Sequence, residues 1–177
     1  MKQKQFTLGA NILLSLFAVV DFLPRPFESK SGYIKRLIKN KTDFWSYYKA
    51  LLYLEKRGLV KIYKEGQKQY IQLTKKGQLE TLFIKARMPV KEKWDGKWRM
   101  IIFDIPEGAR QERNKLRLLL KTNGFKAVQE SVFINPYPLN REAIAYLDET
   151  RLNVYIRIFR IDEVDNESSL KKMFNLS

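Results

Sequence analysis

The chain has 177 residues, of which 45% are hydrophobic, enough to bury one or two small cores. It contains no cysteine and no histidine, which excludes disulfides, thiolate zinc sites, cysteine nucleophiles and Ser-His-Asp catalysis. Any metal chemistry would therefore depend on carboxylates that hold Mg²⁺ or Mn²⁺.

The formal charge of +15 is concentrated in the first half of the chain. Up to Lys97 there are 21 Lys and Arg against 8 Asp and Glu, a net charge of +13; from Trp98 onward there are 13 against 11, a net charge of +2. A small domain with such an excess attracts polyanions. Nucleic acid is the expected partner, with a merely soluble basic surface as the alternative.

An apolar run at residues 8–20 follows two lysines. A signal peptide is one interpretation, but the run lacks a small-residue cleavage site, contains Asn11 and is too short to span a bilayer. Its apolar residues recur at helical spacing, which predicts a core helix. We therefore expect a cytoplasmic protein with no membrane partner.

Two prolines break the chain after this helix, and a short second helix is predicted at residues 32–39. A third helix follows, capped by Thr42 or Asp43 and terminated by Gly58. The residues expected to form its inward stripe are Tyr47, Ala50, Leu51 and Leu54.

A β-hairpin is predicted next, with strands at residues 59–64 and 69–73 about a turn at 65–68. A fourth helix begins at residues 74–77. Three helices, a hairpin and a helix predict a winged helix-turn-helix domain, which we assign to residues 1–90.

Residues 50–60 (ALLYLEKRGLV) and 73–77 (LTKKG) resemble many bacterial winged-helix regulators. In that geometry the third helix enters the major groove of DNA, and the wing lies along the backbone or minor groove. Polar side chains on the helix suit bases or phosphates, and the lysines before it and at the wing suit phosphates. The candidate DNA-binding residues are Lys35, Arg36, Trp45, Ser46, Tyr48, Lys49, Lys64, Gln67 and Lys68.

A second apolar stripe lies on the face of the third helix that should meet DNA. Trp45, Tyr48 and Leu52 fall at positions i, i+3 and i+7. They either contact thymine methyl groups or read the shape of DNA, or they pack against the second domain or a partner subunit. The sequence leaves both interpretations open.

The second half is predicted to follow the order β-α-β-β-α-β, which is the ferredoxin-like arrangement. The strands are expected at residues 99–105, 125–129, 132–135 and 154–160, and the helices at 107–122 and 139–150. We assign this domain to residues 91–177, with a short helix near 170–176 at its end.

The apolar strands of this domain predict a homodimer. The two helices can cover only one face of a four-stranded sheet. Ile101, Phe103, Phe133 and Ile156 are too apolar to alternate cleanly with water. We therefore expect a two-fold dimer that buries sheet against sheet.

Motifs spread over this half resemble the central domain of the phenylacetate-catabolism repressor (PaaX) family. They are residues 94–107 (WDGKWRMIIFDIPE), Arg110, 116–120 (LRLLL), Gly124, Phe125, Gln129, 131–133 (SVF) and Arg157. That domain is in turn similar to the small dimeric subunit of the CRISPR adaptation complex. The resemblance implies a homodimeric, DNA-binding transcriptional regulator, a repressor. Since the sequence ends after a short helix, we expect the family's usual further domain to be missing, and a small-molecule effector such as an aryl-CoA is left open.

Asp104 gives an alternative function. The resemblance implies that two such carboxylates, one from each subunit, hold Mg²⁺ or Mn²⁺ for a metal-dependent endonuclease. The other interpretation is that Asp104 stabilises the start of the helix after Pro106. Glu107 and Asp95 are the only acids close to it in sequence, whereas metal sites normally recruit more. We therefore expect no catalytic residue and no cofactor, and an architectural subunit of a DNA-integration assembly is a further possibility.

Overall fold

The computed structural model describes residues 6–21, 44–66, 68–88 and 93–176. Contacts divide the chain into two units, Met1–Ile84 (unit 1) and Lys85–Ser177 (unit 2). The predicted second helix, with Lys35 and Arg36, lies outside the described residues.

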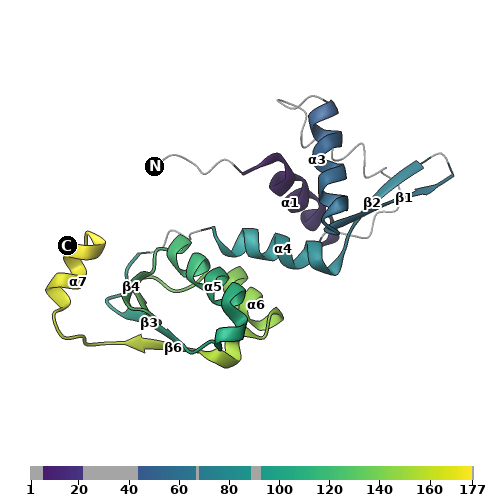
Figure 1. Ribbon diagram of the computed structural model, residues 1–177. Helices are drawn as coiled ribbons and strands as arrows, with labels where there is room; N and C mark the ends of the chain where they lie inside the picture. Colours follow the sequence, from purple (N-terminus) through teal and green to yellow (C-terminus); the bar gives the residue numbers. More distant parts are fainter. Residues whose placement is uncertain (1–5, 22–43, 67, 89–92, 177) are drawn as a thin grey trace. The chain divides into compact units, whose positions relative to one another are not determined.

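Unit 1 combines helices with one β-hairpin (Figure 1). Its elements are α1 (Leu8–Asp21), α3 (Phe44–Lys56), β1 (Val60–Glu65), β2 (Lys68–Leu73) and α4 (Lys75–Ala86), of which α4 ends beyond the unit boundary. The apolar run near the start of the chain does form a helix, and its Ile12, Leu13 and Leu16 are buried. None of the described helices is long and apolar enough to cross a membrane.

The hairpin is antiparallel, with Val60 opposite Leu73 and Glu65 opposite Lys68. Gly66, at φ +61°, therefore lies in the loop. The predicted turn is in the right place, and each strand extends one residue farther into it than expected. Val60, Ile71 and Leu73 are buried, so one face of the hairpin belongs to the core of unit 1.

Unit 2 contains a four-stranded sheet with helices α5 and α6 on one face (Figure 1). Its strand order is β4-β5-β3-β6, and every neighbouring pair is antiparallel. The elements are β3 (Trp98–Phe103), η1 (Glu107–Ala109), α5 (Arg110–Thr122), β4 (Lys126–Gln129), β5 (Val132–Asn135), α6 (Arg141–Glu149), η2 (Leu152–Tyr155), β6 (Ile156–Ile161) and α7 (Glu167–Phe174). The prediction of a mixed helix-and-sheet fold is confirmed.

The apolar residues from which a sheet-to-sheet dimer was predicted are buried within the single chain. Ile101, Phe103, Phe133 and Ile156 occupy one face of the sheet by register, and all four are buried. The helices cover this face, and the Arg117 guanidinium of α5 lies 6.0 Å from the centre of the Phe103 ring. The expectation that these four residues need a partner is therefore wrong.

The opposite face of the sheet is only partly covered. Register places Trp98, Met100, Ile102, Ile134 and Phe159 on it. Residues of and beside α7 cover Trp98 and Ile134, forming a cluster with Leu170, Phe174 and Leu176. Ile102 and Phe159 are still 39% and 45% exposed, so apolar surface remains at the other end of this face.

Buried asparagines fasten the start of unit 2 to its core. The Asn140 side chain donates to the carbonyl oxygens of Ala86 (3.2 Å) and Met88 (2.7 Å). It also accepts from the amide of Ala143 (2.6 Å) and so caps the start of α6. The Asn123 side chain donates to the same Ala86 oxygen at 2.7 Å. These bonds satisfy carbonyl groups that the end of α4 leaves without helical partners.

Candidate nucleic-acid interface

Helix α3 has one face in the core of unit 1 and one in solvent. At 3.6 residues per turn, positions 45, 49, 52 and 56 lie within about 60° of one another and opposite the buried Leu51 and Leu54. We call Trp45, Lys49, Leu52 and Lys56 the outer face of α3; all four are exposed. Trp45 and Leu52 are 67% and 42% exposed, far more than is usual for side chains of this kind.

The charges on the outer face are all positive. Lys49 and Lys56 alternate along it with Trp45 and Leu52, and Glu55 is the only acid in the helix. Glu55 is turned toward the hairpin, where its Oε1 accepts from the amide of Ile62 at 3.2 Å. Glu55 therefore adds no negative charge to the outer face, and its hydrogen bond fixes β1 beside α3.

The hairpin and the end of α3 add further exposed cations and aromatic rings. The Arg57 guanidinium lies 5.7 Å from the centre of the Tyr53 ring. On the hairpin, Tyr63 and Tyr70 stack with ring centres 5.4 Å apart. Exposed lysines flank this pair at positions 61 and 64. Unit 1 therefore interleaves positive charge with aromatic surface, as nucleic-acid-binding proteins do.

A compact junction holds the end of α3, the hairpin and α4 together. Thr74 Oγ1 donates to the carbonyl oxygen of Gly58 (2.7 Å) and accepts from the amide of Gly77 (3.0 Å), which caps α4. Gly58 has φ +68°, the left-handed conformation that ends a helix. Lys76 Nζ donates to the carbonyl oxygen of Arg57 at 2.8 Å. The LTKKG motif is thus the part of the chain that sets the hairpin against α3.

Burial changes the chemistry of one tyrosine on the inner side of α3. The hydroxyl of Tyr47 is enclosed and has no hydrogen-bond partner among the described residues. Burial raises the pKa of Tyr47 from 10.0 to about 12. The Tyr47 side chain therefore stays neutral, and its role in α3 is to pack against the core of unit 1.

The predicted contact residues that the structure describes are on the surface. Trp45, Ser46, Tyr48, Lys49 and Lys64 are all exposed. Gln67, like Lys35 and Arg36, lies outside the described residues, and of Lys68 only the backbone, in β2, is described. The sequence interpretation missed Lys56, although its spacing of seven residues from Lys49 already places it on the same helix face.

Asp104 follows β3 directly, and its amide donates to the carbonyl oxygen of Tyr155 at 3.0 Å. Its side chain is exposed. Neither η1 nor α5 begins with a side-chain cap, so the predicted role of Asp104 at the start of a helix is not a capping hydrogen bond. Among the described residues no three acids gather in a way that could hold a metal ion.

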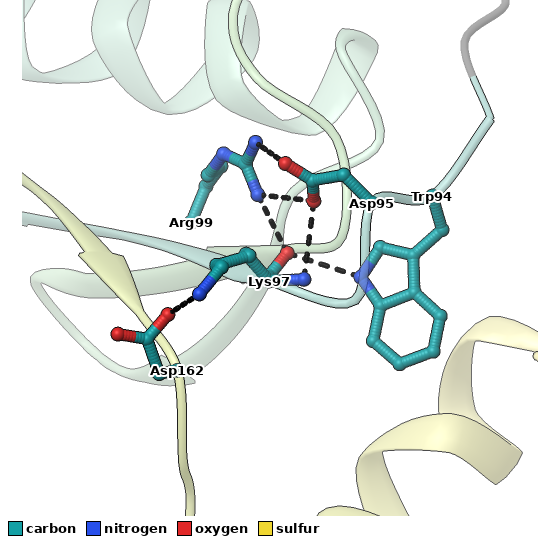
Figure 2. Close-up of polar contacts among 5 residues, drawn as sticks. All are labelled: Trp94, Asp95, Lys97, Arg99 and Asp162. Carbon is teal, nitrogen blue, oxygen red and sulfur yellow. Dashed lines mark hydrogen bonds and ion pairs between the residues drawn. The ribbon is translucent and has the colours of Figure 1, made fainter.

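The acids closest to Asp104 in sequence have other partners. Glu107 accepts from Arg113 at 2.8 Å. Asp95 forms a two-bond ion pair with Arg99, at 2.9 and 2.7 Å (Figure 2). Asp95 lies before β3 and Asp104 directly after it, at opposite ends of a six-residue strand that is about 20 Å long. Asp95 therefore cannot share a metal with Asp104 in the same chain.

Figure 2 shows what the WDGKWR motif does instead. Asp95 also accepts from the amide of Lys97 (3.1 Å), and the Trp94 indole donates to the Lys97 carbonyl oxygen (3.0 Å). The Lys97 side chain pairs with Asp162, just after β6. The Arg99 guanidinium is the main cause that holds the pKa of Asp95 well below its ordinary value. The motif thus closes a turn that fixes the start of β3 to the end of β6.

The comparisons with known proteins concern unit 2. Residues 91–173 match the family model of the PaaX protein central Cas2-like domain, which confirms the resemblance predicted for this half of the chain. The match begins after α4 and therefore does not include α3 or the hairpin. No curated protein matched the chain.

Proposed function

Since residues 91–173 are identified as a PaaX protein central Cas2-like domain, we propose that this chain is a transcriptional regulator that binds duplex DNA. In this proposal unit 1 contacts the DNA and unit 2 joins two copies of the chain in the cytoplasm. The observation that carries it is the outer face of α3, where exposed lysines alternate with exposed apolar side chains.

Unit 1 suits a winged helix. A helix with a solvent-facing basic side is followed by a two-stranded hairpin and a further helix, in the order that such domains use. In this assignment α3 is the recognition helix and the β1-β2 hairpin is the wing. The Glu55 bond to β1 and the Thr74 junction hold the wing at a fixed position beside α3.

Unit 2 suits a ferredoxin-like dimerisation domain. Its strands and helices follow β-α-β-β-α-β, and the first and third strands of that order, β3 and β5, are adjacent in an antiparallel sheet. The residual apolar surface at Ile102 and Phe159 is the part of the sheet that a second copy would cover. A two-fold dimer would present two copies of α3 to a palindromic operator.

The surroundings of Asp104 favour a repressor over an endonuclease. Glu107, the acid nearest to it in sequence, is bound to Arg113, and Asp95 lies at the other end of β3. Two carboxylates, one from each subunit, would then have to hold the metal, without a cluster of three acids around either of them among the described residues. We accordingly assign Asp104 no catalytic role and the protein no metal cofactor.

The experiment is a binding assay with duplexes selected by the full chain from a randomised pool. Reversing two charges on the outer face (Lys49→Glu with Lys56→Glu) should lower affinity about a hundredfold, because each substitution removes a charge-assisted hydrogen bond to the DNA. The matched control reverses Lys115 and Lys121, which are exposed on α5 of unit 2, and should leave affinity within about threefold of the parent. Equal binding by both variants would refute the assignment of α3.

A further inference from the structure

The exposed side chains of α3 also indicate which bases it reads. Seven residues separate Trp45 from Leu52, about 10 Å along the helix axis, which is about the rise of three base pairs. Both are exposed on the outer face, where they alternate with Lys49 and Lys56. A polyanion that presents apolar groups in a groove complements such a face. An uncharged apolar protein surface would complement it poorly, because the ammonium groups of Lys49 and Lys56 would have no counter-charges there.

The composition of α3 narrows the choice among base edges. Guanine is typically read by Arg or Lys, adenine by Asn or Gln, and cytosine by Asp or Glu. The sequence of α3, FWSYYKALLYLEK, contains no Arg, Asn, Gln or Asp, and its one Glu is bonded to β1. The feature of the major groove that an indole or a leucine side chain does complement is the C5 methyl group of thymine.

We propose that Trp45 and Leu52 are specificity-determining residues that contact thymine methyl groups in the major groove, while Lys49 and Lys56 contact phosphates or guanine. The proposal rests on the proposed function, since it requires that α3 enters the major groove. It predicts that the selected binding sites contain thymines about three base pairs apart in each half-site.

The test replaces thymine by deoxyuridine in a selected duplex, which removes the methyl groups and leaves the hydrogen-bonding pattern unchanged. The parent chain should bind the uracil duplex more weakly, by about fourfold for each methyl group that a side chain covers. The Trp45→Ala and Leu52→Ala variants should each discriminate less between the two duplexes, and the double variant should bind both equally. The control is Leu118→Ala, an equally exposed leucine on α5 of unit 2, which should retain the full preference for thymine.

The outcomes separate this inference from the proposed function. Equal binding of thymine and uracil duplexes by the parent would overturn the inference and leave duplex binding intact. An undiminished thymine preference in the double variant would also overturn it, and a change of molecular mass in that variant would then assign the two side chains to contact with a second copy. Failure of the parent to bind any duplex would overturn both.

Discussion

Gly77 lies directly against the carbonyl group of Leu59. A Cβ atom at position 77 would be 1.9 Å from that oxygen and 3.0 Å from the Leu73 side chain. A residue larger than glycine therefore does not fit at this position. The contact joins the start of α4 to the start of the hairpin. It gives a structural reason for glycine in the LTKKG motif, independent of any contact with DNA.

The Gly77→Ala variant should therefore be less stable than the parent. Alanine in a helix normally stabilises by up to about 1 kcal/mol relative to glycine, but overpacking here should cost about 1–3 kcal/mol or more. Urea unfolding of the full chain measures the difference. Gly108→Ala is the matched control, because a Cβ there would meet nothing within 4 Å. A Gly77→Ala variant as stable as the parent would contradict the packing described.

Thr74 should contribute through its hydroxyl group. The Thr74→Ala variant loses the bonds to the Gly58 carbonyl oxygen and the Gly77 amide, which should lower the free energy of unfolding by about 1 kcal/mol. Thr74→Ser keeps the hydroxyl and should be destabilised less. The same unfolding assay compares the two, and equal destabilisation would show that the methyl group rather than the cap matters.

Unit 2 should lose stability in acid. The pKa of Asp95 is lowered mainly by its hydrogen bonds from Arg99, that of Asp162 by Lys97, and that of Glu167 by Lys171. Because the folded state depresses these pKa values, the stabilisation is present above the ordinary values of 3.8 and 4.5 and declines as the pH falls below them. Thermal unfolding midpoints measured between about pH 7 and 3 should show this decline.

The Asp95→Asn variant isolates the largest of these interactions. Its unfolding midpoint should be lower than that of the parent at neutral pH and should change less with acid, since one of the responsible carboxylates is gone. Asp165→Asn, in the turn before α7, serves as the control. An unchanged acid profile in Asp95→Asn would show that the ion pair with Arg99 contributes nothing to stability.

Association of two chains should depend on the partly covered face of the sheet. In light scattering the parent should have twice the 21.1 kDa mass of one chain. The Phe159→Glu variant should have the mass of a single chain, because the dimer would bury an unpaired charge in its interface. Leu118→Glu, at an exposed position on α5, should keep the mass of the parent. A parent chain that is monomeric at micromolar concentration would contradict the proposed dimer.

Periodicity was sufficient to predict most of the described elements to within a few residues of their bounds. The exceptions are local. The helix predicted from residue 107 begins with the short turn η1, and α5 starts at Arg110. The last strand starts at Ile156 rather than 154, because residues 152–155 form the turn η2. The composition of η2 (LNVY) does not distinguish it from the strand beside it.

Which apolar residues stay exposed could not be predicted in the same way. Neighbouring positions such as Ile101 and Ile102 have the same side chain, yet one is buried under the helices and the other is 39% exposed. The difference depends on strand register and on where α7 packs, and both are properties of the tertiary structure. The same applies to Asp95, whose pairing with Arg99 requires a turn that the sequence spacing alone does not show.

The salt dependence of duplex binding tests the central claim most directly. If a dimer makes about eight phosphate contacts, log K against log salt should have a slope near −7, and replacing Lys49 and Lys56 by alanine should make the slope shallower by about 0.9 for each phosphate that these lysines neutralise. If α3 binds DNA, the slope should be steep and these two substitutions should reduce it. An affinity that does not change with salt, or a slope unaffected by the removal of both ammonium groups, would contradict the proposal that α3 binds DNA.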